Sequence, residues 1–222
     1  MPTIVITGSD TDVGKTWVTA AIAAAAEKDG VSIVTQKWVQ CGGLEAPDIA
    51  YHDQYLDQPP SEEWKTHRSP YRFSEPVSPH LASSVDKVAI EWTPILESLK
   101  ALEAHFDWVI IEGSGGLMVP LSDKQLLIDG FQQLAAPTLL VVPNRVGCIN
   151  QALLSLEALK SRNIPTIGFV LNTMDPDQPA LAMRDHASTI ESWSGVPFLG
   201  EVPYQANLKE CAWPIWNQLK TR

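Results

Sequence analysis

The sequence predicts an α/β fold, in which a mainly parallel sheet is flanked by helices in a three-layer arrangement. Apolar, β-branched runs of strand length alternate with segments of helix length, and this alternation implies right-handed crossovers between parallel strands. Most runs are apolar on successive residues, which is the pattern of strands covered on both faces. The 222 residues are enough to bury one full core, and we expect residues 1–222 to form a single domain.

The expected elements follow from this alternation in chain order. The strand candidates are the most continuous apolar runs: Ile4–Thr7, Ser32–Val39, Trp108–Glu112, Thr138–Pro143, Thr166–Asn172 and Phe198–Val202. The helix candidates lie between and after them: Lys15–Asp29, Thr93–His105, Asn150–Arg162, Pro179–Trp193 and one more near the C-terminus. Between Cys41 and Pro79 the chain is richer in proline, histidine and acidic residues, so we expect an irregular insert there.

Composition argues against several classes of function. The net charge is −10 and no run of lysine or arginine occurs, so the basic face that a nucleic-acid binder needs is missing. The apolar runs have the length of strands and are far shorter than a membrane span, and the first residues lack the pattern of a secretory signal. The three cysteines include no C-x-x-C motif, which is typical of reduced thiols in a cytoplasmic protein.

A candidate phosphate-binding loop follows the first strand. The stretch GSDTDVGKTW, Gly8 to Trp17, ends like the motif G-x-x-x-x-G-K-[ST], but its first glycine comes one residue too early. Between a strand and a helix, the backbone amides of Thr11 to Lys15 would converge on phosphates at the positive end of the helix. Lys15 would reach the outer phosphates, and the Thr16 hydroxyl would reach Mg²⁺. The alternative is a strand-to-helix turn that contains glycine by coincidence.

Two charged residues follow the second strand candidate. Lys37 lies near its carboxyl end, the edge at which open α/β sheets bind ligands. A lysine there can neutralise charge on a transferring phosphoryl or carboxyl group, and the alternative is an exposed lysine at a strand end. Asp48 follows in a predicted loop, where the alternative role is a helix N-cap.

The third strand candidate ends in a carboxylate followed by glycines. Glu112 precedes Gly113, Gly115 and Gly116, and small residues beside a carboxylate suit close approach of a ligand and of Mg²⁺. The alternative is a glycine-rich turn capped by the glutamate. The histidines lack zinc-site spacing, so we expect His80 and the stretch Tyr51–Asp53 to be surface or structural.

Longer motifs connect these pieces to a known family. They are GSDTDVGKT, SPYRFSEPVSPH at Ser69–His80, EGSGG, PLSD at Pro120–Asp123, VGCINQALLS at Val146–Ser155, GFVLN ending at Asn172, and GEVPY at Gly200–Tyr204. In this order they resemble dethiobiotin synthetase over nearly the whole chain, and the variant loop resembles that family's own. The family is a branch of the P-loop proteins that includes nitrogenase iron protein and the partition ATPases, so the resemblance implies a P-loop NTPase-like architecture.

The resemblance implies an ATP-dependent ring closure within biotin biosynthesis. In that reaction 7,8-diaminononanoate and CO₂ form dethiobiotin, with release of ADP and phosphate. One amine captures CO₂ as a carbamate, a carbamate oxygen attacks the γ-phosphate, and the second amine closes on the resulting carbamic-phosphoric anhydride. Such a site needs positive charge around the phosphates and a water-poor pocket, because the anhydride is labile.

The resemblance also implies roles for individual residues. Those near the reacting groups are Lys15, Lys37 and Thr11, and the implied Mg²⁺ ligands are Thr16, Asp48 and Glu112. The implied nucleotide-binding set is Asp12, Val13, Gly14, Lys15, Thr16, Trp17, Asp48, Glu112, Gly113, Ser114, Gly115, Asn172, Pro203, Tyr204 and Glu210. The implied substrate-binding residues are Cys41, Gly147, Cys148, Ile149 and Asn150, the last four acting across the interface of a homodimer.

The chain departs from the family pattern beside Lys37. The family usually has Lys-Pro-Val-x-[Ser/Thr]-Gly, whereas this chain has Trp38 for the proline and Cys41 for the hydroxyl residue. A thiol is a weaker hydrogen-bond donor, which puts substrate contacts at this position in question. The loop between Lys37 and Asp48 is also shorter than in many relatives. The alternative function is a nucleotide switch that controls partner binding, although the second loop lysine usual in partition ATPases is absent between Gly8 and Gly14.

Overall fold

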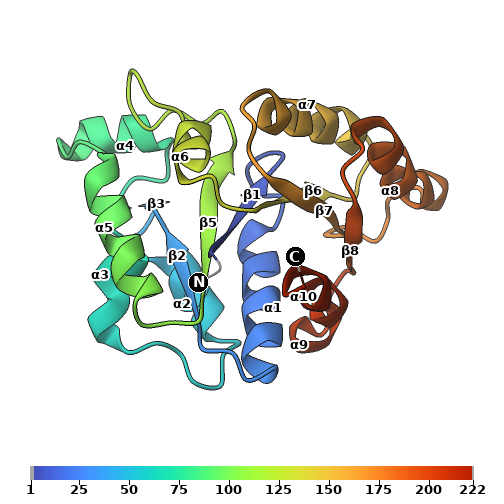
Figure 1. Cartoon of the computed structure of the whole chain (residues 1–222). Helices are drawn as coiled ribbons and strands as arrows, with labels where there is room; N and C mark the ends of the chain where they lie inside the picture. The colour runs from blue at the N-terminus through green and yellow to red at the C-terminus, as the bar shows by residue number, and fades with distance from the viewer. Residues whose placement is uncertain (1–2, 222) are drawn as a thin grey trace.

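A six-stranded parallel sheet forms the centre of the computed structural model, which describes residues 3–221 (Figure 1). The strand order is β2-β5-β1-β6-β7-β8, and each neighbouring pair is parallel. The strands are β1 Thr3–Gly8, β2 Ile33–Lys37, β5 Trp108–Gly116, β6 Thr138–Pro143, β7 Thr166–Asn172 and β8 Phe198–Val202. The predicted α/β class with a parallel sheet is confirmed.

Two apolar cores cover the two faces of this sheet. In β1, Ile4 and Ile6 pack toward one face and Val5 toward the other, so a continuously apolar strand supplies both cores. On the first face lie α1 Lys15–Lys28, α9 Leu208–Cys211 and α10 Trp213–Leu219, which are side by side in Figure 1. On the second face lie α4 Pro79–Asp86, α5 Trp92–Glu103, α6 Leu127–Leu134, α7 Cys148–Ser161 and α8 Ala180–Ser194. The three-layer arrangement follows.

The second strand candidate, Ser32–Val39, is wrong as one strand. β2 ends at Lys37, and β3 Val39–Cys41 pairs instead with β4 Tyr71–Phe73 in a separate two-stranded sheet. Trp38 lies at the break with 1% of its surface exposed. Its ring centroid lies 5.4 Å from that of Trp92 and 5.4 Å from that of Phe131. Burial of this large ring in the core therefore coincides with the point where the chain leaves the sheet.

The expected irregular insert contains regular structure. Between Cys41 and Pro79 the chain forms α2 Pro47–Asp53, a 3₁₀ turn η1 Glu62–Trp64, α3 Lys65–Arg68 and β4. The third strand also runs four residues beyond its predicted end, because β5 continues to Gly116. Short elements of this kind lack the long periodic pattern from which sequence arguments work.

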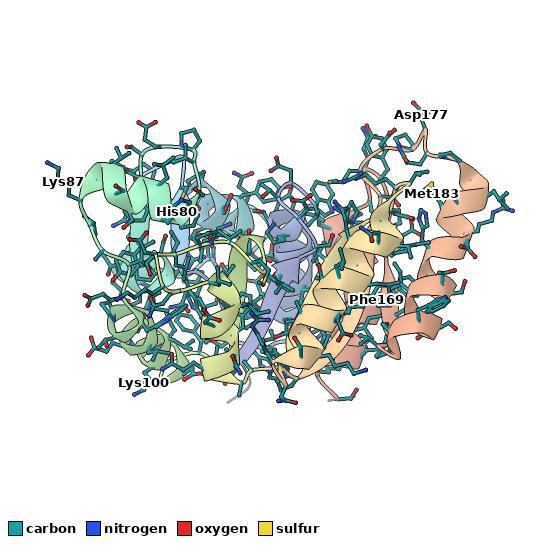
Figure 2. All side chains as sticks on the ribbon, turned by 90° about the horizontal axis from the view of Figure 1, so that it is seen from above. His80, Lys87, Lys100, Phe169, Asp177 and Met183 are labelled. Carbon is teal, nitrogen blue, oxygen red and sulfur yellow. The ribbon has the colours of Figure 1, made fainter. Side chains whose placement is uncertain are left out.

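The carboxyl ends of β1, β2 and β5 meet at one edge of the sheet, because these strands are neighbours and parallel. Figure 2 looks down on the molecule and shows His80 of α4 and Met183 of α8 toward its opposite ends. Across residues 3–221, no helix is long and apolar enough to cross a membrane.

Candidate active site

The loop after β1 closes on the first turn of α1. Gly14 precedes the helix with a φ of +87°, a left-handed conformation that glycine adopts without strain. A Cβ on Gly14 would lie 1.9 Å from Nδ2 of Asn172, whose amide donates a hydrogen bond to the Val13 carbonyl at 3.0 Å. In the described first turn of α1 there is no acidic side chain, so the positive end of the helix remains available to an anion.

Lys15 lies buried inside this loop. Its Nζ donates a hydrogen bond to the Asp10 carbonyl at 2.9 Å. Burial and the nearby Lys37 ammonium lower the pKa of Lys15 to about 8, against the opposite effect of surrounding carboxylates. A ligand that brings negative charge to Lys15 would favour its protonated form.

Lys37, the last residue of β2, is held between the carboxylates of Glu112 in β5 and Asp48 in the first turn of α2. Its Nζ lies 2.7 Å from Oε1 of Glu112 and 2.5 Å from Oδ2 of Asp48. Thr16 Oγ1 donates a hydrogen bond to the same Glu112 oxygen at 2.9 Å. Burial opposes charge on Lys37, but the two carboxylates outweigh it and raise the pKa of Lys37. Burial likewise opposes charge on Glu112, but Lys37 and His52 hold its pKa well below the ordinary range.

Helix α2 supplies two side chains to this cluster. Asp48 was expected in a loop or as an N-cap, but it is the second residue of α2, directly after Pro47. His52 follows four residues later on the same helical face and is fully buried, which rules out the surface alternative. Its Nε2 lies 2.8 Å from Oε2 of Glu112, and its Nδ1 lies 3.0 Å from Oγ1 of Thr35. The signal for this helix was the proline followed by an acidic residue, which marks a helix start.

One cavity of about 760 Å³ is lined by the charged members of this cluster, Lys15, Lys37, Asp48 and Glu112, but not by His52. Its walls come from the phosphate loop, the ends of β2 and β5, β3, α2, the segment before α4 and the chain after β7: Thr11, Asp12, Gly14, Lys15, Thr16, Lys37, Val39, Gln40, Cys41, Asp48, Pro76, Val77, Ser78, Pro79, Glu112, Ser114, Gly115, Val119 and Met174. The fold thus brings together charged residues that are far apart in the sequence. The lining residues that were not predicted individually include Pro76–Pro79, for which the only signal was the motif at Ser69–His80.

The two departures from the family pattern have different positions. Cys41 lines the cavity, half-buried, and burial raises the pKa of its thiol. Trp38 is not in the described lining and donates a hydrogen bond from Nε1 to Oε1 of Gln36 at 3.0 Å within the core. Cys41 therefore is the departure that faces a ligand, whereas Trp38 affects the path of the backbone.

Other predicted nucleotide-binding residues lie outside the described lining of this cavity. Asn172 is buried behind the loop, whereas Pro203, Tyr204 and Glu210 are exposed beyond β8. The residues outside the lining are Val13, Trp17, Gly113, Asn172, Pro203, Tyr204 and Glu210. Asn172 supports the loop in the free protein, and the contacts of the whole set with a nucleotide stay a prediction.

The predicted substrate-carboxylate segment forms the start of α7. Gly147 precedes the helix with a φ of +92°, Cys148 is buried, and Asn150 is exposed. Gln151, in the next position, donates a hydrogen bond to Asp10 of the phosphate loop at 3.1 Å. None of Gly147–Asn150 belongs to the described lining of the cavity in the single chain, so their substrate role also stays a prediction.

The donor set fits a hard divalent cation. Within residues 3–221, no three His, Cys, Asp or Glu side chains are gathered around a common metal position, so protein carboxylates alone would not complete a shell. Thr16 Oγ1 and Glu112 Oε1 lie 2.9 Å apart, which matches neighbouring ligands of octahedral Mg²⁺ at about 2.9 Å. Since the low pKa of Glu112 keeps it ionised, Thr16, Glu112 and Asp48 offer the oxygen ligands that Mg²⁺ prefers.

Comparison with known proteins finds one matching family and relatives that cover most of the chain. Residues 2–212 match the family described as AAA domain. The chain is 36% identical to ATP-dependent dethiobiotin synthetase BioD 1 of Salmonella typhi, over 90% of this chain and 88% of that protein. It is 37% identical to ATP-dependent dethiobiotin synthetase BioD of Halalkalibacterium halodurans, over 91% and 85%.

Solved structures at lower identity share the fold. The MinC:MinD cell division protein complex of Aquifex aeolicus has a TM-score of 0.65 at 14% identity, covering 100% of this chain and 97% of the other. The cell division ATPase MinD of Pyrococcus furiosus has a TM-score of 0.58 at 18% identity, covering 100% and 99%. At these identities the likeness concerns the fold alone.

Proposed function

Since this chain belongs to the dethiobiotin synthetase family, we propose that residues 1–222 form a single ATP-dependent ligase domain that converts 7,8-diaminononanoate and CO₂ into dethiobiotin. The observation that carries the proposal is the convergence of Lys15, Lys37 and Glu112 on one cavity. Each chemical step in this reaction involves an anion: a carbamate, the ATP phosphates and the phosphate that leaves. Fixed cationic donors in a partly closed site stabilise such charge as it develops.

The two lysines have different tasks in the proposed reaction. Lys37 uses two N–H groups on Glu112 and Asp48, which leaves a third for a carbamate or phosphate oxygen. Lys15 uses one N–H on the Asp10 carbonyl and has two left for the β- and γ-phosphates. Thr11 is an exposed residue of the same cavity lining, and its proposed role is to contact the reacting groups.

In the proposed site Thr16, Asp48 and Glu112 would hold Mg²⁺. When bound, the cation supplies neutralisation of phosphate charge. The chain's own side chains orient the carbamate against the γ-phosphate and keep water from the anhydride. The second amine then attacks the carbamate carbon, the C–O bond to phosphate breaks, and the ring nitrogen loses a proton.

The substrate carboxylate is proposed to bind at the start of α7 of a second copy of the chain. The amides of Gly147–Asn150 lie at a helix N-terminus, where a carboxylate is favoured. Exposed apolar side chains lie along this region: Val146 shortly before the helix, and Leu154 within it, which lines a pocket with Met118. They support burial against another chain. A two-fold dimer would give each subunit the helix end of its partner. We also propose that the protein works in the reducing cytoplasm, which is supported by its three free cysteine thiols.

Turnover of ATP with and without the other substrates tests the proposed function. A ligase of this kind should release phosphate only when both the diamine and bicarbonate are present. The nucleotide-switch alternative shares the loop and the fold, but it predicts slow ATP hydrolysis that the diamine does not change. Diamine-independent hydrolysis as the main activity would therefore refute the proposal and favour the switch.

A further inference from the structure

A chain of buried hydrogen bonds ends on the second oxygen of Glu112. Arg68 donates from Nη2 to Oγ1 of Thr35 at 3.0 Å. Thr35 Oγ1 lies 3.0 Å from Nδ1 of His52, whose Nε2 lies 2.8 Å from Oε2 of Glu112. All four side chains are at most 3% exposed. The first oxygen of Glu112, Oε1, contacts Thr16 and Lys37 instead.

The chemistry of the two ends fixes the direction of the first and last of these hydrogen bonds. An ionised carboxylate can only accept, so the Nε2 of His52 must carry a hydrogen and donate it to Glu112. A guanidinium can only donate, so Oγ1 of Thr35 accepts from Arg68 and keeps its own hydrogen to give. The Thr35 hydroxyl has one hydrogen and two lone pairs, so it can either donate to Nδ1 of His52 or accept from it. Both arrangements satisfy every member of the chain, and in both of them Nε2 of His52 carries the hydrogen that Glu112 accepts.

The network is also anchored at its far end. Arg68 forms a two-point ion pair with Asp53, through Nη1 to Oδ2 at 2.8 Å and Nη2 to Oδ1 at 2.6 Å. Asp53 follows His52 directly in α2, so two consecutive residues connect this helix to the β2 region. The same helix carries Asp48, which contacts Lys37.

We propose that His52 is a positioning residue for Glu112. The torsion at the end of a glutamate side chain is broad, so a carboxylate held at one oxygen can still turn. By holding Oε2, His52 directs Oε1 toward Thr16 and Lys37, where the cation and phosphates of the nucleotide bind if the proposed function holds. Partners that orient metal-binding side chains in this way typically contribute about 10- to 100-fold to metal affinity or activity.

Two substitutions at His52 separate positioning from packing. His52→Leu removes the donor, and it should raise the Mg²⁺ concentration for half-maximal nucleotide binding about 10- to 100-fold. His52→Gln carries an amide nitrogen that can reach the position of Nε2, and it should recover most of that loss. Nucleotide binding is measured by calorimetry during Mg²⁺ titration and needs no turnover. An unchanged Mg²⁺ requirement in folded His52→Leu would overturn the proposal.

His186 provides the matched control. It is another buried histidine, with Nδ1 2.8 Å from Oδ1 of Asn144, and within residues 3–221 it forms no hydrogen bond with Glu112. His186→Leu should lower the unfolding temperature as a loss of a buried hydrogen bond does, yet leave the Mg²⁺ requirement unchanged. If His52→Leu and His186→Leu shift the Mg²⁺ requirement equally, the effect is general destabilisation and His52 has no positioning role.

A spectroscopic measurement on the unmodified protein tests the hydrogen arrangement without any activity. In ¹⁵N NMR of the nucleotide-free chain, His52 should show a protonated Nε2. A hydrogen on Nδ1 with a bare Nε2 would leave Glu112 without this donor and would overturn the inference. Because this readout does not depend on ring closure, failure of the proposed function and failure of the His52 inference can be distinguished.

Discussion

Replacement of Lys37 by methionine should destabilise the folded protein by an amount that depends on pH. The change keeps an unbranched apolar stem of similar length and removes the ammonium that lies 2.7 Å from Glu112 and 2.5 Å from Asp48. The Glu112 side chain is 0% exposed, so water cannot replace the lost partner. Removal of one partner from a buried ion pair typically costs about 3–5 kcal/mol, and we expect the lower part of that range at pH 8, because His52 and Thr16 still donate to Glu112.

The sign of the pH dependence follows from the pKa of Glu112. In the wild type, Lys37 and His52 hold this pKa below its unfolded value, so the stability that Glu112 contributes is present above pH about 4.3 and is lost as the pH falls through the folded pKa. In Lys37→Met, burial dominates and raises the pKa of Glu112. Its charge then costs stability at high pH, and protonation removes that cost as the pH falls. The deficit of the variant should therefore be largest at pH 8 and smaller at pH 5.

Urea unfolding without nucleotide, at pH 5 and pH 8, measures this deficit. Adding Glu112→Gln to Lys37→Met should restore part of the lost stability at pH 8, since it removes the uncompensated charge. Lys65→Met is the surface control: it breaks the exposed ion pair with Glu45, whose Nζ–Oε2 distance is 2.8 Å, and should hardly change the unfolding free energy. A deficit of equal size at both pH values would refute the reasoning about Glu112.

Three further predictions concern ligands. The pKa of Lys15 is about 8 in the free protein, and phosphate charge favours its protonated form. ATP binding at pH 9 should therefore take up close to one proton, which calorimetry in buffers of different ionisation enthalpy measures. The absence of proton uptake would contradict this prediction. Cys41→Ser should keep or improve turnover, because a hydroxyl is the better hydrogen-bond donor. A loss of turnover beyond about tenfold, or about 1.4 kcal/mol, would mean that the contacts at this wall of the cavity require the sulfur atom. Dilution below the dimer dissociation constant should weaken diamine binding much more than ATP binding, because Lys15 and Thr16 lie in one chain with the rest of the nucleotide loop. If ultracentrifugation shows a monomer that keeps full diamine affinity, the role of Gly147–Asn150 is contradicted.

The sequence was sufficient to predict a parallel sheet and the candidate residues near the carboxyl ends of its strands, although the bounds of β2 and β5 differ from those predicted. β6, β7 and β8 have the predicted bounds. β6 is an apolar run buried along its whole length, whereas β8 is only partly buried and includes the exposed Glu201. Lys37 and Glu112 could be placed together, because parallel neighbouring strands end at one edge. Their direct contact could not be predicted, because it depends on the register of β2 against β5.

The structure of the insert between Cys41 and Pro79 could not be predicted from the apolar pattern of the sequence. Helix α2 spans seven residues, too few for a clear helical period, so the shared face of Asp48 and His52 was not visible in the sequence. The break at Trp38 was also missed, because an apolar run does not reveal that a ring packs between Trp92 and Phe131. Long periodic elements are determined locally, whereas these short ones depend on contacts with distant residues.

The most direct test of the central claim is the product itself. The protein is incubated with Mg-ATP, the diamine and ¹³C-bicarbonate, and the mixture is analysed by mass spectrometry while ADP is measured. The account predicts a cyclic urea that carries the ¹³C label, with ADP formed in proportion to it and no such product when ATP is omitted. ATP consumed at the same rate without the diamine, with no labelled urea formed, would contradict the claim that this chain is a ring-closing ligase.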